Sequence, residues 1–259
     1  MRERRRALVT GAAMGIGRAV AERLARDGTA TVLLDVAADA LNDLAHSLTA
    51  AGATAHVVVG SVADASACEA AVAVARDSLG GLDILSHNAG IQRYGTVEGT
   101  DEALWDEVMN VNLKGAYLIS RAAMPLLRES RGAIVLMSSA QGLASQQGVL
   151  AYSVAKHGLV GMVRSMAVDY AALGVRVNAV APGAVDTPML RNALRLSPEP
   201  DAVWRELESM HPIGRVARAE EIAEVVAFLA SEAASFVTGD VVRVDGGLLA
   251  RIGGSPRKE

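Results

Sequence analysis

Short apolar segments alternate along the chain with longer segments in which apolar residues recur every three to four positions. The short segments are Ala7–Val9, Thr31–Leu34, His56–Val59, Ile84–Leu85, Ala133–Met137, Val175–Val180 and Val241–Val244. The longer, helical segments include Arg18–Arg26, Ala65–Ser78 and Gly148–Leu173. Continuously apolar strands are typical of a parallel sheet that helices cover on both faces. The pattern therefore predicts an α/β fold built on a doubly wound parallel sheet of about seven strands.

The organisation of the chain favours one domain. No internal repeat, low-complexity tract or linker divides residues 1–259. Helical periodicity is weakest between Asp186 and Pro212, and this proline-rich segment, about 186–212, is expected to form a broken helical flap above the sheet. The last residues, about 252–259, are expected to be frayed. The arginine-rich run at residues 2–6 is expected to be a solvated tail before the first strand.

Composition and charge narrow the functional class. A formal net charge of −4 offers no general attraction to a nucleic acid or an anionic membrane. No segment approaches the ~20 apolar residues of a membrane span, and the first apolar run is too short for a signal peptide. Cys68 is the only cysteine, and no histidine lies at metal-ligand spacing from it. These observations predict a cytoplasmic, metal-free protein that acts on small molecules, with Cys68 as a buried apolar side chain.

A glycine-rich turn follows the first strand and leads directly into a helix. Gly11, Gly15 and Gly17 let the backbone approach a pyrophosphate closely and direct the N-terminus of the helix toward it. Glycines also serve turns for purely conformational reasons, but the position at the first strand-to-helix junction favours a dinucleotide site. We expect Gly11, Met14, Gly15, Ile16 and Gly17 to contact the cofactor.

Asp35 ends the second predicted strand, 18 residues after Gly17. At about this separation an acidic residue reaches the ribose hydroxyls of the adenosine half of a dinucleotide. The carboxylate would repel a 2′-phosphate, and neither the glycine turn nor the residues just after Asp35 supply a cation to bind one. The sequence thus favours NAD over NADP. A helix-capping or surface aspartate is the alternative.

Tyr152 and Lys156 lie four residues apart in a strongly helical segment and should project from one face. The pKa of a phenol, near 10, must fall by about three units, equivalent to ~4 kcal/mol, before the group is a base at neutral pH. An ammonium group one turn away would lower the pKa of Tyr152 in this way. A tyrosine and a lysine at this spacing also occur on ordinary amphipathic helix surfaces, so other motifs must decide whether the pair is catalytic.

Six motifs in order resemble the short-chain dehydrogenase/reductase family. They are TGAAMGIG from Thr10, NAG at Asn88–Gly90, VNLKG around Asn112, the serines at 138 and 139, YSVAK from Tyr152, and APG at Ala181–Gly183. The resemblance runs from about Ala7 to Gly247. It implies a single-domain Rossmann-type fold and NAD-dependent hydride transfer between the nicotinamide and a secondary alcohol or ketone. It also implies a homotetramer, for which the predicted helices Leu104–Leu127 and Val149–Tyr170 have surplus apolar positions.

The resemblance also implies roles for individual residues. Tyr152 would be the general acid/base, Ser139 would bind the substrate oxygen, Lys156 would bind the nicotinamide ribose, and Asn112 would help to hold a water-linked proton relay. Further cofactor contacts would come from Asp35, Ser61, Val62, Asn88, Ala89, Gly90, Tyr152, Pro182, Gly183, Val185 and Thr187. Of these, Asn88–Gly90 would line the adenine side of the cleft, and Val185 and Thr187 would contact the carboxamide.

Two positions depart from the pattern of the family. His87 and Ser61 stand where the family commonly has asparagine and aspartate. We expect His87 to be a packing or hydrogen-bonding substitute at the end of a strand. Ser61 can still form a hydrogen bond but lacks the carboxylate, so it should hold the adenine amino group more weakly.

Polar side chains are frequent where the substrate should bind. They are Gln92, Arg93, Tyr94, Gln141, Gln146, Gln147, Asn192 and His211, of which Gln92, Gln141 and Gln147 are the predicted substrate contacts. Such groups favour a small polar substrate, namely a sugar, polyol or hydroxy acid, because unpaired buried polar groups each cost about 1–3 kcal/mol.

Two other functions remain open from the sequence. One is a 3-oxoacyl-carrier-protein reductase, which Asp35 disfavours, although Arg191 and Arg195 in the flap could face a carrier protein. The other is a non-catalytic NAD-binding regulator, which would not need all four of Asn112, Ser139, Tyr152 and Lys156.

Overall fold

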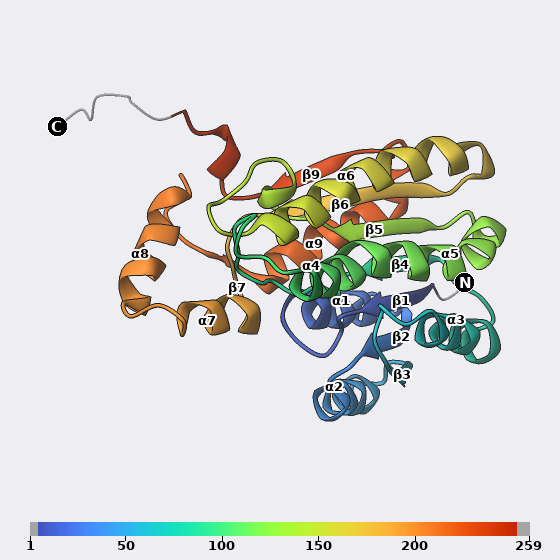
Figure 1. The fold of residues 1–259 in the computed structure, drawn as a ribbon. Coiled ribbons are helices and arrows are strands. Elements are labelled where there is room, and N and C mark those ends of the chain that lie inside the picture. Colours follow the sequence, from blue (N-terminus) through green and yellow to red (C-terminus); the bar gives the residue numbers. More distant parts are fainter. Residues whose placement is uncertain (1–4, 253–259) are drawn as a thin grey trace.

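A seven-stranded, entirely parallel sheet forms the centre of the computed structural model, which describes residues 5–252 (Figure 1). The strands are β1 (Arg6–Thr10), β2 (Ala30–Asp35), β3 (Ala55–Val59), β4 (Ile84–His87), β5 (Ala133–Met137), β6 (Arg176–Pro182) and β9 (Val241–Val244). Their order in the sheet is β3-β2-β1-β4-β5-β6-β9. Successive strands are added outward in one direction from β1 to β3 and in the other direction from β4 to β9. The switch point between β1 and β4 is where ligands bind in open α/β sheets. The predicted fold class and its seven strands are confirmed.

Helices cover both faces of this sheet. They are α1 (Gly15–Arg26), α2 (Ala38–Ala50) and α9 (Ala219–Ala230) on one face, and α3 (Ala65–Leu79), α5 (Gly115–Ser130) and α6 (Leu150–Tyr170) on the other. Val9 packs with the first group and Leu8 with the second, and neither side chain is exposed. Successive strand residues point to opposite faces, so a strand buried on both faces must be continuously apolar.

A wide helical turn connects α4 (Glu102–Met109) with α5. Residues Asn110–Lys114 form one turn of π-helix, so the predicted helix Leu104–Leu127 is continuous but locally underwound, with an extra residue in this turn. Such π turns occur frequently at functional sites. Here the turn contains Asn112.

The proline-rich segment forms two short helices, α7 (Pro188–Leu194) and α8 (Pro200–Met210). Each begins with its proline, because proline has the φ angle of a helix and lacks an N–H that the first turn would leave unpaired. The short strands β7 (Val185–Asp186) and β8 (Ala217–Arg218) pair at the base of this flap. Figure 1 shows α7 and α8 beyond the carboxyl ends of the central strands. Of the tail expected to be frayed, residues 253–259 lie outside the described residues.

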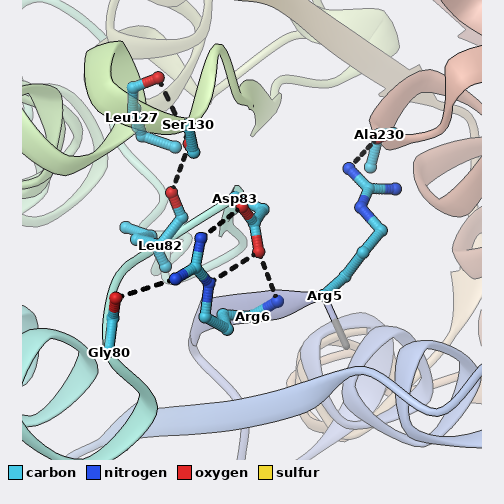
Figure 2. Close-up of polar contacts among 8 residues, drawn as sticks. All are labelled: Arg5, Arg6, Gly80, Leu82, Asp83, Leu127, Ser130 and Ala230. Carbon is cyan, nitrogen blue, oxygen red and sulfur yellow. Dashed lines mark hydrogen bonds and ion pairs between the residues drawn. The ribbon is translucent and has the colours of Figure 1, made fainter. Parts of the chain in front are cut away.

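Arg5 and Arg6 form specific contacts at the opposite end of the sheet (Figure 2). Arg6 donates from Nε and Nη2 to the two carboxylate oxygens of Asp83 at 2.9 and 2.8 Å, and its backbone N–H donates to the same carboxylate. Arg5 donates to the carbonyl of Ala230 at the C-terminal end of α9 at 2.6 Å. The expected solvated tail is therefore wrong for these two residues, because a paired carboxylate and free helix carbonyls bind them. Residues 2–4 lie outside the described part of the chain.

The Arg6–Asp83 pair should contribute measurably to stability, because it connects β1 to the start of β4. We expect Asp83→Asn to lower the free energy of unfolding by about 1–3 kcal/mol, since charged hydrogen bonds are lost. Urea denaturation would measure the change. Asp77→Asn is the matched control, because the Arg76–Asp77 side chains are 61% and 64% exposed and this pair should contribute little. Equal stabilities for the Asp83 variant and the unmodified protein would contradict the assignment.

Candidate active site

A cavity of about 1090 Å³ opens at the carboxyl ends of the strands, between the sheet and the flap. Single small-molecule sites span roughly 300–1,000 Å³, so this cavity has room for more than a small substrate. The predicted site residues that line it are Gly11, Met14, Gly15, Ile16, Gly17, Asp35, Ser61, Val62, Asn88, Ala89, Gly90, Gln92, Ser139, Gln141, Tyr152, Lys156, Pro182, Gly183, Val185 and Thr187. Asn112 and Gln147 are the two predicted residues that do not line it.

The glycine turn has the close packing that a pyrophosphate site needs. Gly11 and Gly15 have φ angles of +63° and +56°, which favour glycine. A Cβ on Gly17 would overlap the carbonyl oxygen of Gly11, and a Cβ on Gly11 would lie 2.7 Å from the backbone nitrogen of Ala89. Met14, the N-cap residue of α1, makes no side-chain cap, so the first N–H groups of the helix remain open to a ligand. The turn therefore fits a dinucleotide.

Asp35 is held in place at the end of β2. Its Oδ2 accepts a hydrogen bond from the Ala13 backbone at 3.0 Å, and its Oδ1 accepts one from the Ala37 backbone at 3.0 Å. Each carboxylate oxygen retains a free lone pair. The carboxylate can therefore accept hydrogen bonds from ribose hydroxyls without moving.

Tyr152, Lys156 and Ser139 meet at the other end of the cavity. Tyr152 and Lys156 project from the first turns of α6 and are 8% and 4% exposed, while Ser139 follows β5. Lys156 Nζ donates to the Met137 carbonyl at 2.7 Å and lies 5.4 Å from the centre of the Tyr152 ring. The hydroxyl oxygen of Ser139 accepts from the Gln141 backbone at 3.1 Å. As predicted, Tyr152 and Lys156 project from the same face of α6.

Burial dominates the titration of this pair. Removal from water raises the pKa of Tyr152 to about 12, and a hydrogen bond with Ser139 only partly opposes the change. Burial also lowers the pKa of Lys156 to about 8. The pKa of Tyr152 is thus raised where the sequence predicted a fall, because desolvation disfavours the charged phenolate.

Asn112 lies behind the cavity and is fully buried. Its Nδ2 donates to the carbonyls of Ile91 and Val108 at 2.9 and 3.0 Å, and its Oδ1 accepts from the Ile91 backbone at 3.1 Å. The side chain thus holds the loop after β4 against the π turn. Its role in a proton relay stays a prediction.

The Asn88–Gly90 loop spans more of the site than expected. Asn88 Nδ2 donates to the Thr10 carbonyl at 3.2 Å, which joins the ends of β1 and β4. A Cβ on Gly90 would lie 2.7 Å from Asn112 Oδ1 and 3.5 Å from Lys156 Nζ. Gly90 therefore lies beside the catalytic candidates Asn112 and Lys156, and its place on the adenine side stays a prediction.

Comparison with known proteins identifies the family. A family model described as enoyl-(acyl carrier protein) reductase matches residues 11–249. Cis-4-hydroxycyclohexanecarboxylate dehydrogenase of Sinomonas cyclohexanicum is 44% identical over 246 residues, which cover 94% of this chain and 96% of that protein. The chain is a short-chain dehydrogenase/reductase.

Two solved structures of short-chain dehydrogenases/reductases share the whole fold. Ligand-free aldohexose dehydrogenase of Thermoplasma acidophilum superposes with a TM-score of 0.90 at 35% identity and covers 99% of this chain and 98% of its own. Levodione reductase superposes with a TM-score of 0.92 at 37% identity and covers 96% of this chain and 98% of its own. These comparisons confirm the family resemblance. The chain is an oxidoreductase that acts on CH–OH groups, and its family generally uses nicotinamide cofactors.

The two departures from the family pattern have local explanations. His87 is 1% exposed and its Nδ1 forms a hydrogen bond with Thr10 Oγ1 at 2.9 Å, so its prediction as a hydrogen-bonding substitute is confirmed. Burial, with a smaller effect of Lys156, lowers the pKa of His87 to about 3 and keeps the ring neutral. Ser61 lines the cavity, and its hydroxyl oxygen accepts from the Ala63 backbone at 3.2 Å.

The structure brings together only part of the predicted polar substrate site. Gln147 is exposed outside the cavity, and its prediction as a substrate contact is wrong because the loop before α6 carries it into solvent. Gln141 Nε2 donates to Gln146 Oε1 at 2.8 Å, and Arg93 pairs with Glu107 at 2.6 Å. The flap contributes a mostly apolar wall to the cavity, with Met189, Leu190, Val203, Leu207 and Met210 among its members.

Two hydrogen bonds of this site have no signal in the sequence. The Met137 carbonyl orients Lys156, but a backbone carbonyl has no residue identity to read. Ser138 is 3% exposed and its hydroxyl donates to the Lys156 carbonyl at 3.1 Å, which fixes α6 to the end of β5. Ser138 thus bonds to α6 while Ser139 faces the cavity, because successive residues of an extended segment point to opposite sides.

Within residues 5–252, no group of three or more His, Cys, Asp or Glu side chains could hold a metal ion. In that range no helix has both the length and the apolar character for crossing a bilayer. Cys68 is buried as predicted, and burial raises the pKa of its thiol to about 11, so it is inert at neutral pH.

Proposed function

We propose that this protein is an NAD-dependent dehydrogenase that moves a hydride between the nicotinamide and a small secondary alcohol or its ketone. One observation carries the proposal. Tyr152, flanked by Ser139 and Lys156, lies in the same cavity as the glycine turn and Asp35. An acid/base and a dinucleotide site in one cavity suit alcohol–ketone interconversion, in which a hydroxyl proton and a hydride leave together.

In this mechanism each side chain has one task. Tyr152 accepts the hydroxyl proton of the alcohol during oxidation and returns it to the ketone during reduction. Ser139 accepts from Gln141, so its own hydroxyl hydrogen is free to donate to the substrate oxygen or to the phenol. Lys156, oriented by Met137, retains two N–H donors for ribose hydroxyls. When bound, oxidised nicotinamide accepts the hydride, and its positive charge favours the phenolate.

The choice of NAD rests on the charges around the cavity. Asp35 is the carboxylate in its lining, and the lining cations among the described residues are Arg93 and Lys156. Arg93 is paired with Glu107, and Lys156 is beside Tyr152. Neither is available to a 2′-phosphate near Asp35, so binding of NADP would leave two like charges unneutralised.

The substrate we favour is a small ring alcohol with polar substituents, such as a cyclic hydroxy acid or a sugar. The apolar wall of the flap suits a carbon ring, while Gln92 and Tyr94 in the lining offer polar contacts. The names of two similar proteins, cis-4-hydroxycyclohexanecarboxylate dehydrogenase and aldohexose dehydrogenase, agree with this class.

A screen of NAD reduction tests the proposal. The panel contains cis-4-hydroxycyclohexanecarboxylate, aldohexoses, polyols and open-chain hydroxy acids, with cyclohexanol as the matched alcohol that lacks polar substituents. We expect a polar member to have a kcat/KM at least about tenfold above that of cyclohexanol, equivalent to ~1.4 kcal/mol. Turnover of apolar alcohols alone would refute the polar substrate. NAD binding without turnover of any alcohol would favour a non-catalytic NAD-binding regulator instead of an enzyme.

The geometry favours this function over a carrier-protein reductase. Arg191 is paired with Asp186 at 2.6 Å, and Arg195 donates to Asn192 at 3.3 Å, so both candidate contacts for a carrier protein already have partners. The homotetramer also remains a proposal. It is supported by a shallow hollow on the surface of α4, α5 and α6, lined by Met109, Asn110, Leu113, Lys114, Tyr117 and Met162.

A further inference from the structure

His211 makes contacts that its sequence position did not suggest. Although it borders the cavity, its side chain is bonded on both sides, and the residue is 4% exposed. Its Nδ1 lies 2.6 Å from the Leu207 carbonyl in the last turn of α8, and its Nε2 accepts from the Ala184 backbone at 3.1 Å. A ring nitrogen that faces a carbonyl must donate, so the proton is on Nδ1. The ring therefore joins the flap to the end of β6.

Ala184 is held at both of its backbone groups. Its N–H donates to His211, and its carbonyl accepts from the Ala217 backbone in β8 at 3.0 Å. Its neighbours Gly183 and Val185 line the cavity. The packing is tight, because a Cβ on Gly183 would lie 2.5 Å from His211 Nε2. A shift of the His211 ring would therefore remove the hydrogen-bond acceptor of the Ala184 N–H.

We propose that His211 is a positioning residue that couples the flap to nicotinamide binding. By holding the Ala184 N–H, it sets the backbone of Gly183–Val185, the part of the cavity lining that the family resemblance assigns to the nicotinamide half of the cofactor. The pyrophosphate and adenosine contacts of the glycine turn and Asp35 do not involve His211. This inference rests on the proposed function, since it assumes that the cavity binds NAD.

Two conservative variants separate this role from simple capping of α8. In His211→Gln the terminal amide reaches the position of Nε2 and can accept from Ala184, but the donor to Leu207 is lost. In His211→Asn the amide reaches the position of Nδ1 and can donate to Leu207, but the acceptor for Ala184 is lost. A residue that only caps the helix would tolerate asparagine, whereas the positioning role requires glutamine.

The experiment compares the dissociation constants of NAD and ADP-ribose, which lacks the nicotinamide, by isothermal titration calorimetry. We expect His211→Asn to weaken NAD binding by about 10-fold and His211→Gln by less than about 2-fold, because only the former leaves the buried Ala184 N–H unpaired. ADP-ribose should bind both variants as it binds the unmodified protein. Ser209→Ala is the control in the same helix, because the exposed hydroxyl of Ser209 donates to the Glu206 carbonyl and does not line the cavity, and it should leave both constants unchanged.

Three results would overturn the inference. Weaker NAD binding in His211→Gln than in His211→Asn would assign the residue to helix capping. Equal losses of NAD and ADP-ribose would show general damage to the site. Unchanged NAD binding in both variants would show that the bond to Ala184 is dispensable. Failure of the unmodified protein to bind either ligand would instead refute the proposed function.

Discussion

Replacement of Tyr152 with phenylalanine is expected to lower kcat by at least about 100-fold, while the dissociation constant of NAD stays within about twofold. The substitution removes the hydroxyl that exchanges a proton with the substrate and leaves the buried ring in place. Steady-state kinetics on the best substrate from the screen, together with NAD titration, would measure both effects.

The control for this experiment is Tyr94→Phe. Tyr94 also lines the cavity, but it is 45% exposed and does not contact Lys156 in the way Tyr152 does. Tyr94→Phe should keep kcat within about threefold, and loss of a polar contact between Tyr94 and the substrate should appear in KM instead. If Tyr152→Phe kept more than about a tenth of the original rate, less than ~1.4 kcal/mol of transition-state stabilisation would be lost, and another group would have to be the acid/base.

The second large effect concerns the choice of cofactor. We expect the unmodified protein to have a kcat/KM for NAD at least about 100-fold above that for NADP, because two like charges 4 Å apart repel by about 4 kcal/mol at an effective dielectric constant of 20. Asp35→Ala should reduce this ratio by at least about tenfold, since the carboxylate is the group that would meet a 2′-phosphate.

A nearby aspartate gives the control for Asp35→Ala. Asp39 lies in the first turn of α2, is exposed and does not line the cavity. Asp39→Ala should leave the NAD:NADP ratio unchanged, although it removes the same charge. Equal use of both cofactors by the unmodified protein would defeat the role assigned to Asp35.

Some of the site was predictable because strand ends converge. In a parallel sheet the carboxyl ends of all strands lie at one edge, so residues after separate strands meet without further information. Gly11 after β1, Asp35 at the end of β2, Asn88 after β4 and Ser139 after β5 therefore all line one cavity. The partners of individual side chains were not predictable in this way, as His211 and Gln147 illustrate.

By itself the sequence determined where the strands lie and which end of the sheet binds a ligand. Burial on both faces makes a strand continuously apolar, and that signal is local, as in Ala133–Met137, where predicted and observed bounds agree. The tertiary structure alone decided the pKa direction of Tyr152 and the contacts of Arg6 and His211. Desolvation and hydrogen bonding depend on which distant groups surround a side chain, and spacing along one helix or strand carries no record of them.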